Sequence, residues 1–277
     1  DSGASWFTVV MPAATNAGLV ELIVQTSDNG DTTLANAYRY NPAGWIADSG
    51  LVRGGPYIAG GGWHSLGVKS DGTVAAWGQN TYGQANAPAP NADFVAVAGD
   101  SEHSLGLKSD GTIAAWGHND NGEASVPAPN ADFVAVAAGN VHSLGLKSDG
   151  TIVAWGYNHD GQANAPATNA DFVAVAAGDY HSLGLKSDGT VVAWGDNTHG
   201  QTSVPAPNAD FVAVAGGYWH SLGLKSDGTI VAWGHAGDGE TSVPAPNADF
   251  GTFAYGVLPA SRSEERRVGK ECRSRWS

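Results

Sequence analysis

A repeat of 39 residues constrains the fold of this 277-residue chain more than any other feature of its sequence. One copy, residues 169–207, reads NADFVAVAAGDYHSLGLKSDGTVVAWGDNTHGQTSVPAP, and the copies that start at residues 91, 130 and 208 differ from it at few positions. A unit of this length cannot bury its apolar faces alone, so neighbouring units must stack. The recurring histidine and tryptophan of the five copies are His64, His103, His142, His181 and His220, and Trp77, Trp116, Trp155, Trp194 and Trp233.

Each copy contains three apolar runs that predict short β-strands, which in residues 169–207 are Phe172–Ala177, His181–Lys186 and Thr190–Trp194. Asp188-Gly189 separates the last two runs, and Asp-Gly favours a tight hairpin because glycine adopts a positive φ without strain. Pro205-Ala206-Pro207 is a stiff link between units, since proline cannot donate to a sheet ladder. From a unit of three or four strands we expect four-stranded antiparallel blades, with hairpin turns at Asp71-Gly72, Asp110-Gly111, Asp149-Gly150, Asp188-Gly189 and Asp227-Gly228.

Sheets of this kind that stack around an axis form a β-propeller, which is the fold that we expect for the repeats. A linear β-solenoid is the structural alternative, but its turns are usually shorter and lack the paired hairpin and the buried tryptophan in each unit. The 39 Gly and 13 Pro of the chain punctuate turns, so the composition fits an all-β protein without long helices.

The recurring string G-x-x-H-S-L-x-L-K-x-D-G-x-V-x-A-W-G-x-N-x-x-G-Q resembles the repeat of the regulator of chromosome condensation (RCC) family. The resemblance is to the short bacterial form, which also occurs in a propeller-type β-lactamase inhibitor protein, and it covers about residues 52–261. It implies a β-propeller, typically of seven blades. Because the chain shows five copies and the start of a sixth at Asn247–Phe250, we expect a truncated, open ring that self-associates through its end blades.

The amino-terminal residues 1–41 do not follow the repeat. They contain strand-like runs at Phe7–Met11, Leu19–Gln25 and Leu34–Tyr40, with a turn at Asn29-Gly30. The signature Ala-Asn-Ala-aromatic-x-Tyr at residues 35–40 resembles the closing strand of an immunoglobulin-like IPT/TIG domain, so this part is predicted to be a fragment of a β-sandwich. Residues 42–51 form the predicted linker, and residues 52–261 the predicted propeller.

The carboxy-terminal residues 262–277 differ abruptly from everything before them. Their sequence, RSEERRVGKECRSRWS, resembles a translated sequencing adapter, so we treat it as an artefact; a short basic tail is the alternative. Six of the 13 basic and three of the 27 acidic side chains lie there, which leaves residues 1–261 with seven and 24, a formal net charge of −17. Such a surface disfavours binding to nucleic acid and to anionic membranes.

The cysteine content and the apolar stretches of the chain bear on where in or outside the cell the protein is located. The single cysteine, Cys272, lies in the tail, so residues 1–261 offer no disulfide, cysteine-bound metal or thiol chemistry. Exported bacterial proteins often have this composition, and we expect an extracellular or cell-surface location. No apolar stretch is long enough to insert into a membrane.

The recurring histidines and tryptophans are predicted to be structural. The five tryptophans suit blade cores, with each indole N–H bonded to backbone. Each histidine sits at a strand start, where its imidazole can bond two backbone groups; metal binding is the alternative, but equivalent positions in different blades do not converge on one ion. Acidic turns such as Asp120–Glu123 faintly resemble calcium loops, yet Asx turns explain them. We expect no metal, no cofactor and no catalytic residues.

The copies disagree at two segments, the pair before each histidine and the loop after each Trp-Gly. Drift at exposed turns is one explanation, but drift should favour small polar residues. Large aromatic residues and histidines occur instead, as in evolved binding surfaces. In the resembled family, loops at this end of the propeller dock partner proteins. The predicted binding residues are Trp63, Tyr82, Glu102, Val141, Tyr157, Tyr180, Tyr218 and Trp219.

The sequence therefore predicts a non-catalytic binding module of an exported bacterial multidomain protein, with a protein or carbohydrate ligand. The alternative, which rests on family resemblance, is a propeller regulator that acts as an enzyme inhibitor or in the manner of a guanine-nucleotide exchange factor. A hydrolase is disfavoured, because adjacent strand residues such as His181 and Ser182 point to opposite faces of a sheet and cannot form a catalytic dyad.

Overall fold

The computed structural model describes residues 6–7, 19–25, 31–41, 44–47 and 57–250, and it describes side chains from residue 57 onward. Every regular element in these ranges is a β-strand, so the expectation of an all-β chain is confirmed. None of the described residues forms a helix with the length and apolarity that crossing a lipid bilayer requires. The tail 262–277 and the turn at Asn29-Gly30 lie outside the described residues.

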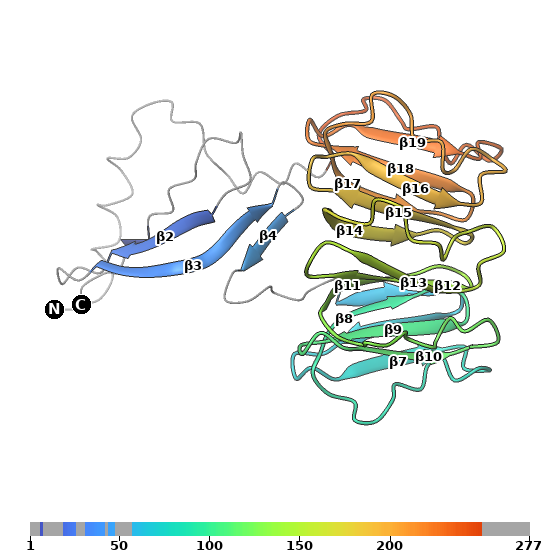
Figure 1. Cartoon of the computed structure of the whole chain (residues 1–277), viewed down its shortest axis with the longest axis horizontal. Helices are drawn as coiled ribbons and strands as arrows, with labels where there is room; N and C mark the ends of the chain where they lie inside the picture. Colours follow the sequence, from blue (N-terminus) through green and yellow to red (C-terminus); the bar gives the residue numbers. More distant parts are fainter. Residues whose placement is uncertain (1–5, 8–18, 26–30, 42–43, 48–56, 251–277) are drawn as a thin grey trace, which may run out of the picture.

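The repeats form five successive three-stranded antiparallel sheets, each with its second strand in the middle (Figure 1). The first sheet contains β5 (Ile58–Gly60), β6 (His64–Val68) and β7 (Val74–Gly78), and the second contains β8 (Phe94–Gly99), β9 (His103–Lys108) and β10 (Ile113–Gly117). The third contains β11 (Phe133–Ala138), β12 (His142–Lys147) and β13 (Ile152–Gly156). The last two contain β14 (Phe172–Ala177), β15 (His181–Lys186) and β16 (Val191–Gly195), and β17 (Phe211–Gly216), β18 (His220–Lys225) and β19 (Ile230–Gly234).

The Asp-Gly turns close the hairpins as expected. In the third sheet, Gly150 has a φ of 81°, which only glycine adopts readily, and its amide donates to the carbonyl of Lys147 at 3.0 Å. The carboxylate of Asp149 accepts bonds from both the amide and the hydroxyl of Thr151, at 2.9 and 2.7 Å. All five sheets repeat this turn, so the local chemistry sets the register of the second and third strands.

The expectation of four-stranded blades is wrong, because the link between sheets does not pair as a strand. In the link after β13, Asn169 lies beside the edge strand and bonds it with its side chain alone: Oδ1 accepts from the amide of Ile152 and Nδ2 donates to its carbonyl, each at 2.7 Å. Prolines in the links lack the amide that a backbone ladder needs. A single asparagine side chain thus replaces the fourth strand in every unit.

Each pair of neighbouring sheets is joined by two unlike apolar faces. The forward face of a sheet carries two leucines and an isoleucine or valine, such as Leu105, Leu107 and Ile113 in the second sheet. The rear face of the next sheet carries a phenylalanine, a valine and a tryptophan, such as Phe133, Val136 and Trp155. These six side chains form one buried cluster, and the other three junctions repeat the arrangement. Burial between sheets, rather than within one, therefore supplies the apolar core.

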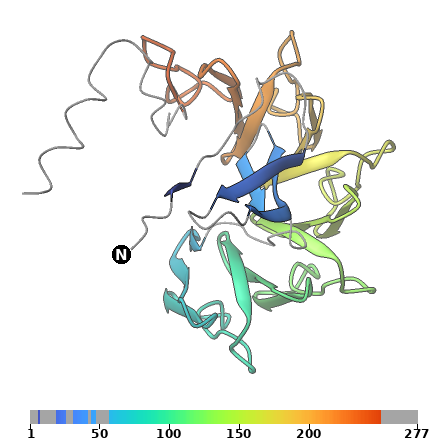
Figure 2. The ribbon, with the colours of Figure 1, turned by 90° about the vertical axis from the view of Figure 1, so that its left-hand side faces the viewer.

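The five sheets fan around a common centre, with their first strands innermost (Figure 2). The strands β5, β8, β11, β14 and β17 pack successively against one another, whereas the first and the last sheet are not in extensive contact. The repeats are therefore β-propeller-like and open between these two sheets.

The amino-terminal strands form a separate antiparallel sheet in the order β1 (Trp6–Phe7), β2 (Leu19–Gln25), β3 (Asp31–Asn41) and β4 (Gly44–Ala47). Strand β4 falls within residues 42–51, so part of the predicted linker pairs with β3. The IPT/TIG assignment and the division into domains remain predictions.

Candidate binding surface at one end of the repeats

The two variable segments of each unit lie side by side. The second and third strands are antiparallel, so the residues before the histidine meet the residues after the Trp-Gly pair. In the first unit the amide of Gln79 donates to the carbonyl of Trp63 at 2.8 Å, and in the third the amide of Tyr157 donates to the carbonyl of Val141 at 2.8 Å. All five units make this bond. We call this end of the repeats, formed by residues 61–63 and 79–83 and their equivalents, the variable-loop end.

The predicted binding residues differ in exposure. Trp63 is 72 % exposed, and Tyr82, Tyr218 and Trp219 are also exposed. The remaining predicted residues are half-buried: Glu102, Val141, Tyr157 and Tyr180. None of the eight is fully buried between the sheets, and all lie at the variable-loop end.

Aromatic rings from neighbouring units touch across the variable-loop end. The ring of Tyr82 meets His118 edge-on, with ring centroids 4.7 Å apart, and so links the first two units. Around Trp219 the rings of Tyr218, His199 and His235 lie within 4.4 to 5.5 Å. These histidines belong to the variable loops but not to the predicted set. His199 and His235 are 36 residues apart in the sequence, and only the stacking of units brings their rings together.

Two acidic side chains at the variable-loop end, the half-buried Asp100 and the buried Asp179, interact electrostatically, and the sequence did not single them out. Burial raises the pKa of Asp179 to about 7, and the charge of Asp100 adds to the shift. Burial likewise raises the pKa of Asp100 to about 6. Asn140 lies close by and donates to Asp179 Oδ2 at 3.3 Å. The pair comes from the second and fourth units, so no local pattern could have predicted it.

Two units carry a histidine–glutamate pair under the loop. His118 Nδ1 contacts Glu123 Oε1 and His235 Nδ1 contacts Glu240 Oε1. Burial lowers the pKa of His118, but the hydrogen bond and charge of Glu123 outweigh it, and the pKa is raised. In the other units glutamine takes the place of glutamate and its Oε1 accepts the same loop amide, as Gln84 does from Tyr82 at 2.9 Å.

The recurring histidines bond neighbouring units through side chains, and His142 also interacts with the backbone of Asp179. In four of the five histidines, Nε2 bonds the serine that follows the histidine of the next unit: His103 Nε2 lies 2.9 Å from Ser143 Oγ, and three other junctions repeat the bond. Burial lowers the pKa of His103 to about 4 and that of His142 to about 3, so these rings are neutral. The described residues contain no cluster of three or more ligating side chains that could hold a metal ion.

The recurring tryptophans also join units. Trp155 Nε1 donates at 2.8 Å to the carbonyl of Glu123 in the preceding unit, and Trp116, Trp194 and Trp233 make equivalent bonds. Trp116, Trp155 and Trp233 are buried and Trp194 is half-buried. Trp77 is 57 % exposed, so its expected burial is wrong: among the residues that the structure describes, no other repeat sheet covers the rear face of the first one.

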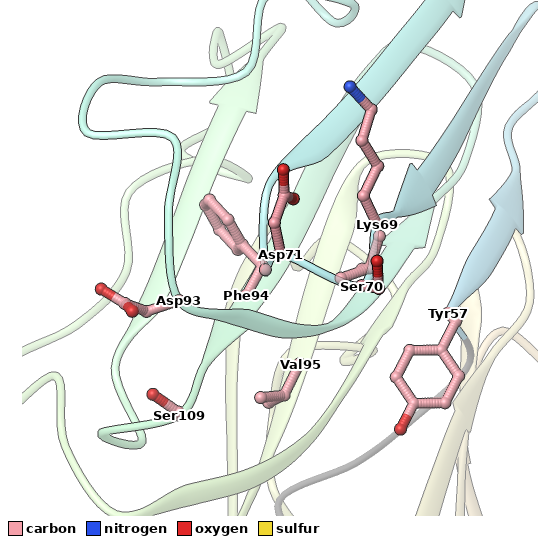
Figure 3. A pocket seen from close by; sticks show the side chains of 10 residues that line it. Tyr57, Lys69, Ser70, Asp71, Asp93, Phe94, Val95 and Ser109 are labelled. Carbon is pink, nitrogen blue, oxygen red and sulfur yellow. The ribbon is translucent and has the colours of Figure 1, made fainter.

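A hollow lies elsewhere on the repeats. It measures about 510 Å³ and sits between the first two sheets at the hairpin end, lined by Tyr57, Lys69, Asp71 and Phe94 among others (Figure 3). It contains none of the predicted binding residues. The candidate surface is instead a broad face of rings and acidic groups, which suits a macromolecular ligand.

Repeated propeller-like sheets with a constant core and a variable end define a binding scaffold, and comparison with known proteins identifies its family. The model of the regulator of chromosome condensation (RCC1) repeat matches residues 57–84, 95–123, 133–162, 172–201 and 211–240. These segments span just over half of the chain, which therefore belongs to the RCC1 repeat family. Propellers of this family are generally protein-binding modules and usually not enzymes.

Solved structures agree on the fold. Prp20p from Saccharomyces cerevisiae, reported with its binding to Gsp1p and histones, has a TM-score of 0.58 and 22% identity over 69% of this chain and 59% of its own. The ectodomain of the Physcomitrella patens receptor kinase CR4 has a TM-score of 0.57 and 24% identity over 65% of this chain and 52% of its own. The chain thus spans less than two thirds of either protein. No curated protein sequence matches it significantly.

Proposed function

We propose that the repeats of this chain recognise a partner protein through the variable-loop end, as a non-catalytic module of an exported bacterial protein. The observation that carries the proposal is the contrast between constant and variable positions. The recurring residues contact one another at the junctions between sheets. The residues that vary include exposed and half-buried aromatic rings at the variable-loop end. A glycan that stacks on Trp63 and Trp219 is the narrower alternative ligand.

The contacts at this end support a protein ligand. The rings form a continuous patch from two units, in which Trp219 contacts His199, His235 and Tyr218. Rigid aromatic side chains give a large contact area at low entropic cost, and such patches dominate the binding energy of protein interfaces. An enzyme inhibitor or an exchange factor would use the same patch, and is a special case of this proposal.

The test is a selection followed by a mutational comparison. A displayed peptide library is selected on the immobilised chain, and the affinity of a selected peptide is measured for the unmodified chain and for Trp219→Ala. We expect the substitution to weaken binding by about 2 kcal/mol, roughly 30-fold, with little change in thermal stability. Trp155→Ala should instead lower the free energy of unfolding by about 3–5 kcal/mol, because it opens a cavity in a junction.

The matched control is Tyr57→Ala, which removes a more exposed ring from the opposite end. It should leave binding unchanged. Selected peptides that depend on Tyr57 and not on Trp63, Tyr180 or Trp219 would contradict the proposal. The same variants on a glycan array distinguish a carbohydrate ligand from a protein one.

A further inference from the structure

The two ends of the repeats differ in charge. The described side chains include five lysines and no arginine, and all five lysines lie at the hairpin end, beside the Asp-Gly turns: Lys69, Lys108, Lys147, Lys186 and Lys225. Four of them hold the ammonium nitrogen 4.8 to 5.1 Å from the ring centre of a phenylalanine. The described segments of the variable-loop end contain neither lysine nor arginine but seven carboxylates: Asp100, Glu102, Asp120, Asp160, Asp179, Asp196 and Asp238. Lysines thus accompany the aspartates of the hairpin end and not the carboxylates of the variable-loop end.

Histidines supply little counter-charge at the variable-loop end. Three of its four histidines already pair with a carboxylate, as His159 Nδ1 does with Asp160 Oδ1 at 3.1 Å. No ion pair of the described residues includes the other five carboxylates of this end: Asp100, Glu102, Asp179, Asp196 and Asp238. Asp179 is only 8 % exposed, and proteins usually pair a buried charge with an opposite one. The variable-loop end therefore carries negative charge that the described part of the chain leaves without a counter-charge.

The rings and the carboxylates of this end are interleaved. Asn140 Nδ2 lies 3.3 Å from Asp179 Oδ2 and 3.5 Å from Tyr180 Oη, so it joins a carboxylate to a ring. Asp238 is exposed in the loop whose histidine contacts Trp219, with ring centroids 5.5 Å apart. An ammonium or guanidinium group is attracted both to the face of an aromatic ring and to a carboxylate. This arrangement therefore favours positively charged side chains.

From these rings and carboxylates we propose that the partner protein presents a basic polypeptide segment, whose lysine and arginine side chains contact the variable-loop end. Because it concerns the same surface, this inference rests on the proposed function. An acidic segment would meet seven like charges, and a neutral one would cover them without a counter-charge, which is unfavourable. The stems of lysine and arginine cover apolar ring surface while their charged groups reach the carboxylates.

The probe for the test is the set of peptides selected from the displayed library on the full chain, at an ionic strength of about 0.15 M, where the Debye length is about 8 Å. We expect lysine and arginine to be more frequent in the selected peptides than in the unselected library. The affinity of one selected peptide is then measured at ionic strengths of about 0.1 and about 1 M, between which the Debye length falls from about 10 to about 3 Å. Binding should weaken by about tenfold or more, because salt screens charges at an exposed surface.

The decisive variant is Asp179→Asn/Asp238→Asn, which removes one buried and one exposed carboxylate and keeps the shape of both side chains. It should weaken binding of the peptide by about tenfold. The matched control, Asp132→Asn/Asp171→Asn, makes the same change of charge at the hairpin end. Both of its positions are exposed and have a φ of 65° or 66°, which asparagine also adopts, so this variant should fold normally and bind the peptide as the native chain does.

Replacement of each lysine or arginine of the peptide by glutamine, one at a time, gives a second measurement that leaves the chain unchanged. At least one replacement should weaken binding to the native chain by about tenfold and should weaken binding to Asp179→Asn/Asp238→Asn clearly less, because the charge with which it interacts is already missing there.

Peptides that require Trp219 but show no excess of lysine and arginine, and that bind equally at both ionic strengths, would overturn the inference and leave the proposed function standing. An equal loss of binding by Asp132→Asn/Asp171→Asn would also overturn it, because the attraction would then come from the overall negative charge of the chain. Peptides that bind independently of Trp63, Tyr180 and Trp219 would contradict the proposed function, and this inference with it.

Discussion

At the scale of single residues, burial decides which groups of the junctions and the variable-loop end carry charge. The junction histidines stay neutral because burial lowers their pKa, which lets Nε2 bond a serine hydroxyl without a counter-ion. Burial acts in the opposite direction on Asp179, whose pKa rises to about 7. The ionised carboxylate therefore lowers the free energy of unfolding by an amount that depends on pH.

Asp179→Asn should stabilise the fold at pH 8 and lose this effect in acid. The folded-state pKa of Asp179 lies above the ordinary value of 3.8, so its ionised form costs stability in full above pH 7, and the cost shrinks as pH falls from 7 through 4, because both states are protonated only below 3.8. We expect a gain on the order of 1–3 kcal/mol in the free energy of unfolding at pH 8. Urea denaturation across this range measures it.

Asp160→Asn is the control, because it removes an exposed carboxylate of another variable loop and should change stability little at any pH. A gain for Asp179→Asn that is the same at pH 4 and pH 8 would mean that the side chain acts through packing and not through its charge.

At the scale of the element, the asparagine of each link acts in place of a strand. Asn169 satisfies both backbone groups of Ile152 on the outer edge of β13, and four other asparagines do the same for their own sheets. One residue on the outer edge strand of each sheet therefore has both of its backbone groups bonded, and the prolines of the link do not take part in the backbone hydrogen bonds of the sheet. This contact also fixes where the chain returns to begin the next sheet, since Phe172 N donates to the carbonyl of Gly150 three residues later.

Asn169→Ala should lower the free energy of unfolding by about 1–3 kcal/mol, because it leaves an amide and a carbonyl of Ile152 without partners. Asn169→Asp keeps the acceptor but places a carboxylate oxygen against the carbonyl oxygen of Ile152, so at neutral pH it should destabilise at least as much as alanine. Chemical denaturation measures both. The neighbouring exposed Thr168→Ala is the control, and an equal effect there would show that the loss comes from the link and not from the two hydrogen bonds.

At the scale of the whole molecule, the array is a row of junctions with two open ends. Each inner sheet is covered on both faces, whereas the first sheet leaves Trp77 exposed and the last leaves Ala213 exposed. In arrays of this kind the stability of a unit depends on its nearest neighbours. Stability should therefore fall from the centre towards both ends.

Native-state hydrogen exchange should show this gradient. Amides of β12, in the middle of the third sheet, should exchange most slowly, and amides of β6 and β18 should exchange faster because each of these strands has only one neighbouring sheet. The differences should amount to about 1–3 kcal/mol in opening free energy. Equal protection of β6, β12 and β18 would show that the five sheets open as a single cooperative unit, contrary to this account.

The sequence by itself determined the units of this protein, because their signals are local. The step of 39 residues, the Asp-Gly hairpins and the three apolar runs predicted the strand bounds almost to the residue, as in Phe172–Ala177 and His181–Lys186. The sequence also predicted the proline link. It did not predict that the side chain of Asn169 would replace the pairing of a fourth strand, because the choice between a side chain and a backbone ladder depends on how the link lies against β13.

Only the tertiary structure decided what lies between units. The sequence singled out Trp63 and Trp219 as variable aromatic residues, but the contacts of Trp219 with His199 and His235, and the pairing of Asp100 with Asp179, join positions 16 to 79 residues apart. The five recurring tryptophans look alike in the sequence, yet Trp155 is buried and Trp77 is exposed. The physical reason is that burial in a repeat array depends on whether a neighbouring sheet is present, and no residue within a unit encodes that.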